Sequence, residues 1–245
     1  MAQRDHGAAA EMLDELESAA DRLGEWLRTH IVPVSAAVIG LLAAAGLGAW
    51  LVSAREGAEE EASSALAQTR ADYLSAMGAQ PGSIEVPEIA NPKAAAEIRG
   101  EYEKRYAEVA REHAGTVAAA LASIEQAGLL SADGREDEAI ALLEQAFAGA
   151  PTKNAVRGVV AQKLAQRFEA GGKWAEAAER HEAASQIADY PLRYWALADA
   201  ARCRAMAGDA AAARALYDRL DREAPDLPLS DDQRAQRLEM RAAAE

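Results

Sequence analysis

The side chains best suited to chemistry in this sequence are four histidines and a single cysteine, Cys203. A metal or acid–base site on one helix needs two such groups three or four residues apart, so that both lie on the same face. None of the histidines has a partner at that spacing; they are His6, His30, His113 and His181. The sequence also has no glycine-rich phosphate loop. We therefore expect no catalytic residues, no cofactor and no metal site, and interpret the chain as a non-enzyme.

The cysteine and two of the histidines have simpler structural interpretations. Cys203 is the only cysteine, so it forms no intrachain disulfide, and its Ala-rich surroundings predict a small buried side chain. His181 is expected to pack in a core. His113 is expected at the end of a helix, where the helix dipole favours a basic group.

The composition points to an all-α protein. Half of the residues are hydrophobic, but aromatic residues make up only 5%, and alanine supplies much of the apolar content. This profile is typical of closely packed helices. The formal net charge of −14 leaves no basic surface for phosphates, so we expect no nucleic-acid binding.

One apolar segment, Ile31 to Val52, contains no charged residue. As a helix it would extend about 33 Å, close to the thickness of the hydrocarbon core of a bilayer. We interpret residues 31–52 as a transmembrane helix, with Trp26 and Trp50 near the two interfaces. A cleaved signal peptide is the main alternative, because Val52-Ser53-Ala54 fits the small-residue cleavage pattern. The long acidic segment before the apolar run argues against it, and a buried helix of a soluble protein is a weaker alternative.

The orientation of this helix is only weakly indicated by charge. Arg22 and Arg28 precede the segment, and Arg55 and Arg70 follow it, so the positive residues are nearly balanced. The short front segment and the large following domain favour a cytoplasmic N-terminus and a C-terminal domain on the far side. Small residues recur every fourth position within the segment, which suits close helix packing, although lipid exposure remains an alternative. They are Gly40, Ala44 and Gly48.

Two further regions precede the repeats. Residues 1–30 form an acidic segment with an amphipathic helix from Met12 to Leu27. Residues 53–115 contain a long helix, a loop rich in proline and glycine, and a second helix from Lys93 to His113. The first of these helices carries an apolar face, expected to pack on the elements that follow, made of Ala62, Leu66, Thr69, Tyr73 and Met77.

A repeated pattern begins near residue 116. Each unit has a turn glycine, an alanine five residues later and a larger side chain four residues after that. The three sets are Gly134, Ala139 and Leu143; Gly172, Ala177 and His181; and Gly208, Ala213 and Tyr217. The pattern resembles the tetratricopeptide repeat, although each unit is two to four residues longer and lacks the expected tryptophan and Leu-Gly. We predict about three repeats in 116–229 and a capping helix in 230–245, opened by a Ser230-x-x-Gln233 capping box and burying Leu238 and Met240.

The resemblance to tetratricopeptide repeats implies a protein-binding groove on the first helix of each repeat. The candidate groove residues are Leu121, Ile124, Val159, Gln162, Gln166, Glu169, Trp195 and Arg202. Each of them can equally be a packing or surface residue. Trp195 is the strongest candidate, because an exposed indole contributes most to interface energetics.

The whole layout resembles the YfgM-like family, ancillary subunits of the bacterial SecYEG translocon. Three short segments carry the likeness: residues 112–116 (EHAGT), 134–139 (GREDEA) and 207–209 (AGD). The resemblance implies a single-pass inner-membrane protein with a periplasmic repeat domain, attached to SecYEG and contacting periplasmic chaperones during protein export. An envelope-assembly or cell-division scaffold, and a self-oligomerising membrane protein, remain alternatives.

Overall fold

The computed structural model describes residues 31–80, 82–83, 85–87 and 89–242, and for residues 31–45, 49, 241 and 242 it describes the backbone alone. The amphipathic segment expected within residues 1–30 lies outside the described residues. Throughout the described ranges the regular secondary structure is helical, which confirms the predicted all-α class.

The chain divides into two compact units, Met1–Glu56 and Gly57–Glu245. Helix α2 (Ile31–Ala76) runs without interruption through the boundary. A search of the described residues finds no helix with the length and apolar character that a membrane crossing needs. The expected transmembrane segment falls at the start of α2, where the side chains of residues 31–45 and 49 lie outside the described part, and the transmembrane assignment stays a prediction.

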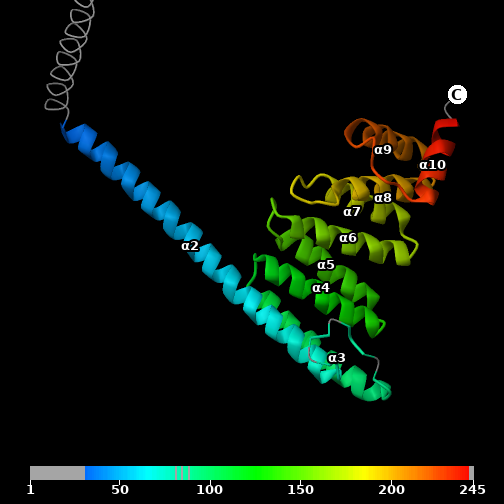
Figure 1. The fold of residues 1–245 in the computed structure, drawn as a ribbon, viewed down its shortest axis with the longest axis horizontal. Coiled ribbons are helices and arrows are strands. Elements are labelled where there is room, and N and C mark those ends of the chain that lie inside the picture. The colour runs from blue at the N-terminus through cyan, green and yellow to red at the C-terminus, as the bar shows by residue number, and fades with distance from the viewer. Residues whose placement is uncertain (1–30, 81, 84, 88, 243–245) are drawn as a thin grey trace, which may run out of the picture. The chain divides into compact units, whose positions relative to one another are not determined.

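The second unit is a stack of helices in chain order (Figure 1). After the C-terminal part of α2 come α3 (Pro92–Glu112), α4 (Val117–Ala132), α5 (Glu136–Gly149), α6 (Ala155–Ala170), α7 (Trp174–Ser185), α8 (Arg193–Met206), α9 (Ala210–Glu223) and α10 (Asp231–Ala242). Consecutive helices from α3 to α10 pack on each other, and α4 also contacts α6, which contacts α8. The face formed by α4, α6 and α8 is called the first-helix face below.

Local side-chain caps explain where several helices begin. Asn91 accepts hydrogen bonds from the N–H groups of Lys93 and Ala94, and Pro92 occupies the first helical position, where a missing N–H costs nothing. Thr116 caps α4 through the N–H of Ala119, at 3.0 Å. Each cap satisfies backbone donors that have no partner within the helix.

The repeat pattern is present in the backbone. Gly134, Gly172 and Gly208 follow α4, α6 and α8 with φ of 77°, 70° and 83°, a left-handed conformation that glycine adopts without strain. The alanines that follow are completely buried, and the larger side chains four residues later are buried as well; they are Ala139, Ala177 and Ala213, then Leu143, His181 and Tyr217. Small side chains at these positions allow the helices of each hairpin to approach closely.

The helix before the repeats packs as its periodicity predicts. Ala62, Tyr73 and Met77 are buried, and Tyr73 lies 5.3 Å from Tyr102 of α3, centroid to centroid. The carboxylate of Glu59 accepts hydrogen bonds from the first two N–H groups of α4, at 3.0 and 3.1 Å. An acidic side chain at a helix N-terminus is favoured by the helix dipole, so α2 from Gly57 onward is joined to the first repeat.

The C-terminal helix differs in one respect from the prediction. The capping box forms, since the N–H of Ser230 donates to Oε1 of Gln233 and the N–H of Gln233 donates to Oγ of Ser230, both at 3.2 Å. Leu238, expected to be buried, is 64% exposed, whereas the polar Gln233 is buried. The face that α10 turns inward is therefore set by hydrogen bonds to α8 as well as by apolar contact.

Candidate functional site

The predicted groove residues all belong to α4, α6 or α8, the helices that form the first-helix face. Leu121 and Ile124 belong to α4, the four residues from Val159 to Glu169 belong to α6, and Trp195 and Arg202 belong to α8. Gln166 and Trp195 are exposed and the other six are partly buried, so none is a fully buried core residue. Ile124 and Val159 contact the apolar clusters beneath. Their assignment to a groove stays a prediction.

Three of these residues, Glu169, Trp195 and Arg202, line one cavity of about 660 Å³. It lies between α6, α8 and the start of α10, and its other lining residues are Asp199, Pro228, Leu229, Ser230, Asp232 and Gln233. The volume falls in the usual range for ligand sites. Trp195 is 39% exposed, and its place at a binding surface stays a prediction. We call this the Trp195 cavity.

Asp199, Asp232 and Gln233 are polar members of this cavity that sequence reasoning did not assign to a binding site. The amide nitrogen of Gln233 donates to Oδ1 of Asp199 at 2.9 Å, which attaches α10 to α8. Nε of Arg202 lies 3.5 Å from the same oxygen. A signal for Asp199 was present, because it lies one turn after Trp195 and one turn before Arg202 on the same helix face. Gln233 was identified only as a cap.

Beside the cavity, Glu169 accepts hydrogen bonds from two other helices. Nε2 of His181 lies 2.7 Å from Oε1 of Glu169, and Nη2 of Arg202 lies 2.7 Å from Oε2. Burial alone would raise the pKa of Glu169, but the hydrogen bonds from His181 and Arg202 outweigh it and lower the pKa to about 2. Glu169 is therefore a carboxylate, and the nitrogen of His181 that faces it carries a proton.

Cys203 completes this group, which we call the Glu169 cluster: Glu169, His181, Arg202 and Cys203. The ligand-type atoms of Glu169, His181 and Cys203 lie within 4.8 Å of one another. Sequence spacing did not predict this association, because the residues belong to α6, α7 and α8. Carboxylate, imidazole and thiol together can bind a transition metal, or can form a nucleophile with its base.

The geometry favours a structural role for the cluster. Burial raises the pKa of Cys203 to about 12, so the sulfur is a protonated thiol, and only the thiolate is nucleophilic. Both oxygens of Glu169 already accept hydrogen bonds, and the guanidinium of Arg202 lies where it would repel a divalent cation. His181 and Cys203 are buried, which confirms the packing predicted for them.

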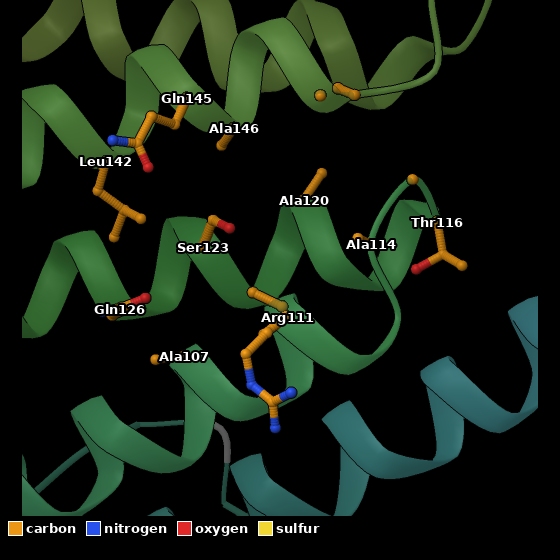
Figure 2. A pocket seen from close by; sticks show the side chains of 14 residues that line it. Ala107, Arg111, Ala114, Thr116, Ala120, Ser123, Gln126, Leu142, Gln145 and Ala146 are labelled. Atoms are coloured by element: carbon orange, nitrogen blue, oxygen red, sulfur yellow. The ribbon is translucent and has the colours of Figure 1, made fainter.

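Two further cavities lie elsewhere in the second unit. One, of about 600 Å³, runs between α2 and α4 and is mainly apolar, with Leu66, Leu74 and the predicted groove residue Leu121 in its lining. The other, of about 370 Å³, lies among α3, α4 and α5. Figure 2 shows α4 between the other two helices, with Arg111 and Gln145 approaching from α3 and α5. Its lining combines small alanines with polar side chains from Arg111, Thr116, Ser123, Gln126 and Gln145.

The predicted packing stripe of α2 can be placed only in part. The side chains at Gly40 and Ala44 lie outside the described residues. Gly48 is exposed, and a Cβ built on it would meet no atom within 4 Å. The stripe stays a prediction.

Comparison with known proteins identifies neighbours by fold alone. No protein-family model matches the sequence, and a search of curated proteins finds no related sequence. Among solved structures, the chain is similar to tetratricopeptide-like repeats assigned to a kinesin light chain of Podosopora anserina and to a single-substitution variant of the same protein. Each match has 19% identity and a TM-score of 0.45, and covers 61% of this chain and 80–81% of the other. The assignment of tetratricopeptide-like repeats therefore rests on the three glycine turns and buried alanines.

Proposed function

We propose that this protein is a membrane-anchored adaptor that binds other polypeptides through the first-helix face of its repeats. The observation that carries the proposal is the exposed indole of Trp195 in the cavity between α6, α8 and α10. Stacked helical repeats build extended binding surfaces, and tryptophan is among the residues that contribute most to interface affinity. The exposed polar and aromatic side chains of this face suit recognition of a polypeptide.

Membrane anchoring is supported by the absence of charged residues in segment 31–52. It is also supported by the exposure of apolar side chains near the C-terminal end of that segment. Leu47, Trp50, Leu51 and Val52 are all exposed large apolar residues on α2. A contiguous patch of exposed apolar side chains marks a surface that contacts lipid or another protein. The proposal places the N-terminus in the cytoplasm and the repeats in the periplasm of a bacterium.

The resemblance to the YfgM-like family suggests a specific partner. We propose that the chain is an ancillary subunit of the SecYEG translocon that connects exported proteins with periplasmic chaperones. Short segments carry this resemblance, so the partner must be identified directly in the membrane.

Site-specific photocrosslinking tests the proposal. A photoactivatable phenylalanine analogue at position 195 of the full-length, membrane-inserted protein keeps an aromatic ring there and is expected to capture translocon subunits, exported proteins or chaperones. The same group at position 179, where Glu179 is exposed on α7, is the matched control and should capture much less. Equal capture at both positions would contradict a binding surface at Trp195.

The same experiment separates the alternatives. Capture of outer-membrane assembly or cell-wall factors would assign the chain to an envelope-assembly or cell-division scaffold. A ladder of self-crosslinked products that persists without Sec components would indicate self-oligomerisation through the Gly40 stripe and flanking helices.

Trp195→Ala supplies an independent test. Because this side chain is exposed, its truncation should reduce partner capture while lowering the thermal midpoint by less than about 3 °C. Circular dichroism during heating measures the midpoint. A much larger drop would mark Trp195 as a core residue and remove it from the proposed surface.

A further inference from the structure

We propose that the Trp195 cavity binds a lysine or arginine side chain of a partner polypeptide, with its aliphatic part on the indole and its charged head at Asp199 and Asp232. This inference rests on the proposed function, since it names the chemistry of the partner at that site. Three observations carry it. The lining of the cavity is acidic, its basic residue Arg202 is already ion-paired, and Trp195 lies beside the carboxylate of Asp199.

The lining of the cavity is acidic. It contains three carboxylates, Glu169, Asp199 and Asp232, and one guanidinium, that of Arg202, which leaves a local net charge of −2. Walls of one charge sign attract ligands of the opposite sign. A segment bearing acidic residues or a free C-terminal carboxylate would be repelled here.

Arg202 is already engaged and does not offer an anion site. Its Nη2 lies 2.7 Å from Oε2 of Glu169, and its Nε lies 3.5 Å from Oδ1 of Asp199. Glu169 in turn uses both of its oxygens for His181 and Arg202. Arg202 is therefore held by Glu169 and Asp199 together, and the cavity keeps its net charge of −2.

The aspartates keep capacity for a cation. Gln233 and Arg202 both approach the same oxygen of Asp199, Oδ1, and a carboxylate offers about four lone-pair sites. Asp232 is exposed at the start of α10, and in the described part of the chain no ion pair or hydrogen bond involves its side chain. A cationic head group placed between α8 and α10 can therefore be bound without breaking an existing ion pair.

Trp195 provides the remaining recognition. It lies four residues before Asp199 on α8, so the indole and the carboxylate share one face of the helix. The face of an indole attracts a cation, and its flat apolar surface suits the methylene groups of lysine or arginine. An uncharged side chain of equal length would gain only the second contact.

Short peptides of defined charge test the inference. The full-length protein is titrated with blocked pentapeptides, Ala-Ala-X-Ala-Ala, in which X is lysine, arginine, norleucine or glutamate. Binding is followed by the NMR signal of the Trp195 indole N–H, identified by its loss in Trp195→Phe. Lysine and arginine peptides should shift this signal, and the shift should weaken as salt screens the charges.

Two variants make the outcome decisive. The double variant Asp199→Asn with Asp232→Asn keeps the size of both side chains. It should reduce the affinity for the lysine peptide about ten-fold. Asp218→Asn, an exposed position on α9, should leave binding unchanged. Thermal midpoints of all variants confirm that each one folds. A norleucine or glutamate peptide that shifts the signal as much as lysine, or equal binding by the double variant, would overturn the inference.

The inference and the proposed function fail in different ways. If crosslinking from position 195 still captures partners in the double aspartate variant, the adaptor function stands and the cationic specificity is wrong. If cationic peptides bind but position 195 captures nothing in membranes, the cavity chemistry stands and the adaptor function is wrong.

Discussion

Leu143 in the first repeat and His181 in the second occupy the same position, yet their surroundings differ. Both are buried four residues after the crossing alanine of their hairpin. Leu143 lies in an apolar cluster, whereas His181 donates a hydrogen bond to Glu169. With the 38-residue spacing of the two turns, the position of Glu169 is occupied by Ser131 in the first repeat.

The comparison shows what this repeat position requires. The hairpin needs a side chain of sufficient volume, and leucine, histidine and tyrosine all supply it. A polar side chain can be buried there only if a neighbouring helix provides its hydrogen-bond partner, because an unsatisfied buried polar group is destabilising. The second repeat provides that partner through Glu169.

Exchanging the two residues is expected to have the largest effect. Leu143→His places an imidazole in an apolar environment and leaves a packing defect, so it should lower the free energy of unfolding by about 3–5 kcal/mol. His181→Leu removes one hydrogen bond of Glu169 and keeps a similar volume, so it should cost only about 1–2 kcal/mol. Urea denaturation followed by circular dichroism measures both. Equal losses would contradict the comparison.

The Glu169 cluster should also respond to acid. The pKa of Glu169 is about 2 in the folded protein, against 4.5 ordinarily. Ionised Glu169 therefore contributes fully to the free energy of unfolding above pH 4.5. This contribution, up to about 3 kcal/mol, is lost as pH falls from about 4.5 toward 2. The free energy of unfolding of the native protein should fall toward that of Glu169→Gln across this range. Glu179→Gln, at an exposed position, is the control. Parallel pH profiles for the native protein and Glu169→Gln would contradict the lowered pKa of Glu169.

Two helical glycines offer a sharper comparison of the repeats. A Cβ built on Gly158 of α6 would clash with the ring of Tyr190, whereas one on Gly128 of α4 would meet no atom within 4 Å. Gly158→Ala should destabilise the protein by about 1–3 kcal/mol, since the buried ring of Tyr190 must move. Gly128→Ala should stabilise it by up to about 1 kcal/mol, because alanine favours the helix. The same sign for both substitutions would be inconsistent with the close contact at Tyr190.

The smallest perturbation is chemical labelling of Cys203. Burial raises its pKa to about 12, so the thiol should react with iodoacetamide at neutral pH only when the repeats open. Mass spectrometry should show little labelling of the native protein and complete labelling in denaturant. Rapid labelling under native conditions would mean that the interface of α7 and α8 is open.

Much of the fold could be predicted from local sequence. The turn glycines, the crossing alanines, the capping box and the apolar face from Ala62 to Met77 each depend on residues within a few positions of one another. Leu238 illustrates the limit, because its apolar character predicted burial, whereas Gln233 is the residue that α10 buries. That choice depends on Asp199, which lies 34 residues away.

The sequence by itself therefore determined that the described chain is helical and that tetratricopeptide-like hairpins begin near residue 116, because helix periodicity, caps and left-handed turns are properties of neighbouring residues. Only the tertiary structure decided that Glu169 meets His181 and Arg202, which lie 12 and 33 residues further along the chain, and that Trp195, Asp199 and Asp232 share one cavity. These associations depend on the angles at which successive helices pack, and those angles result from the contacts of the whole stack.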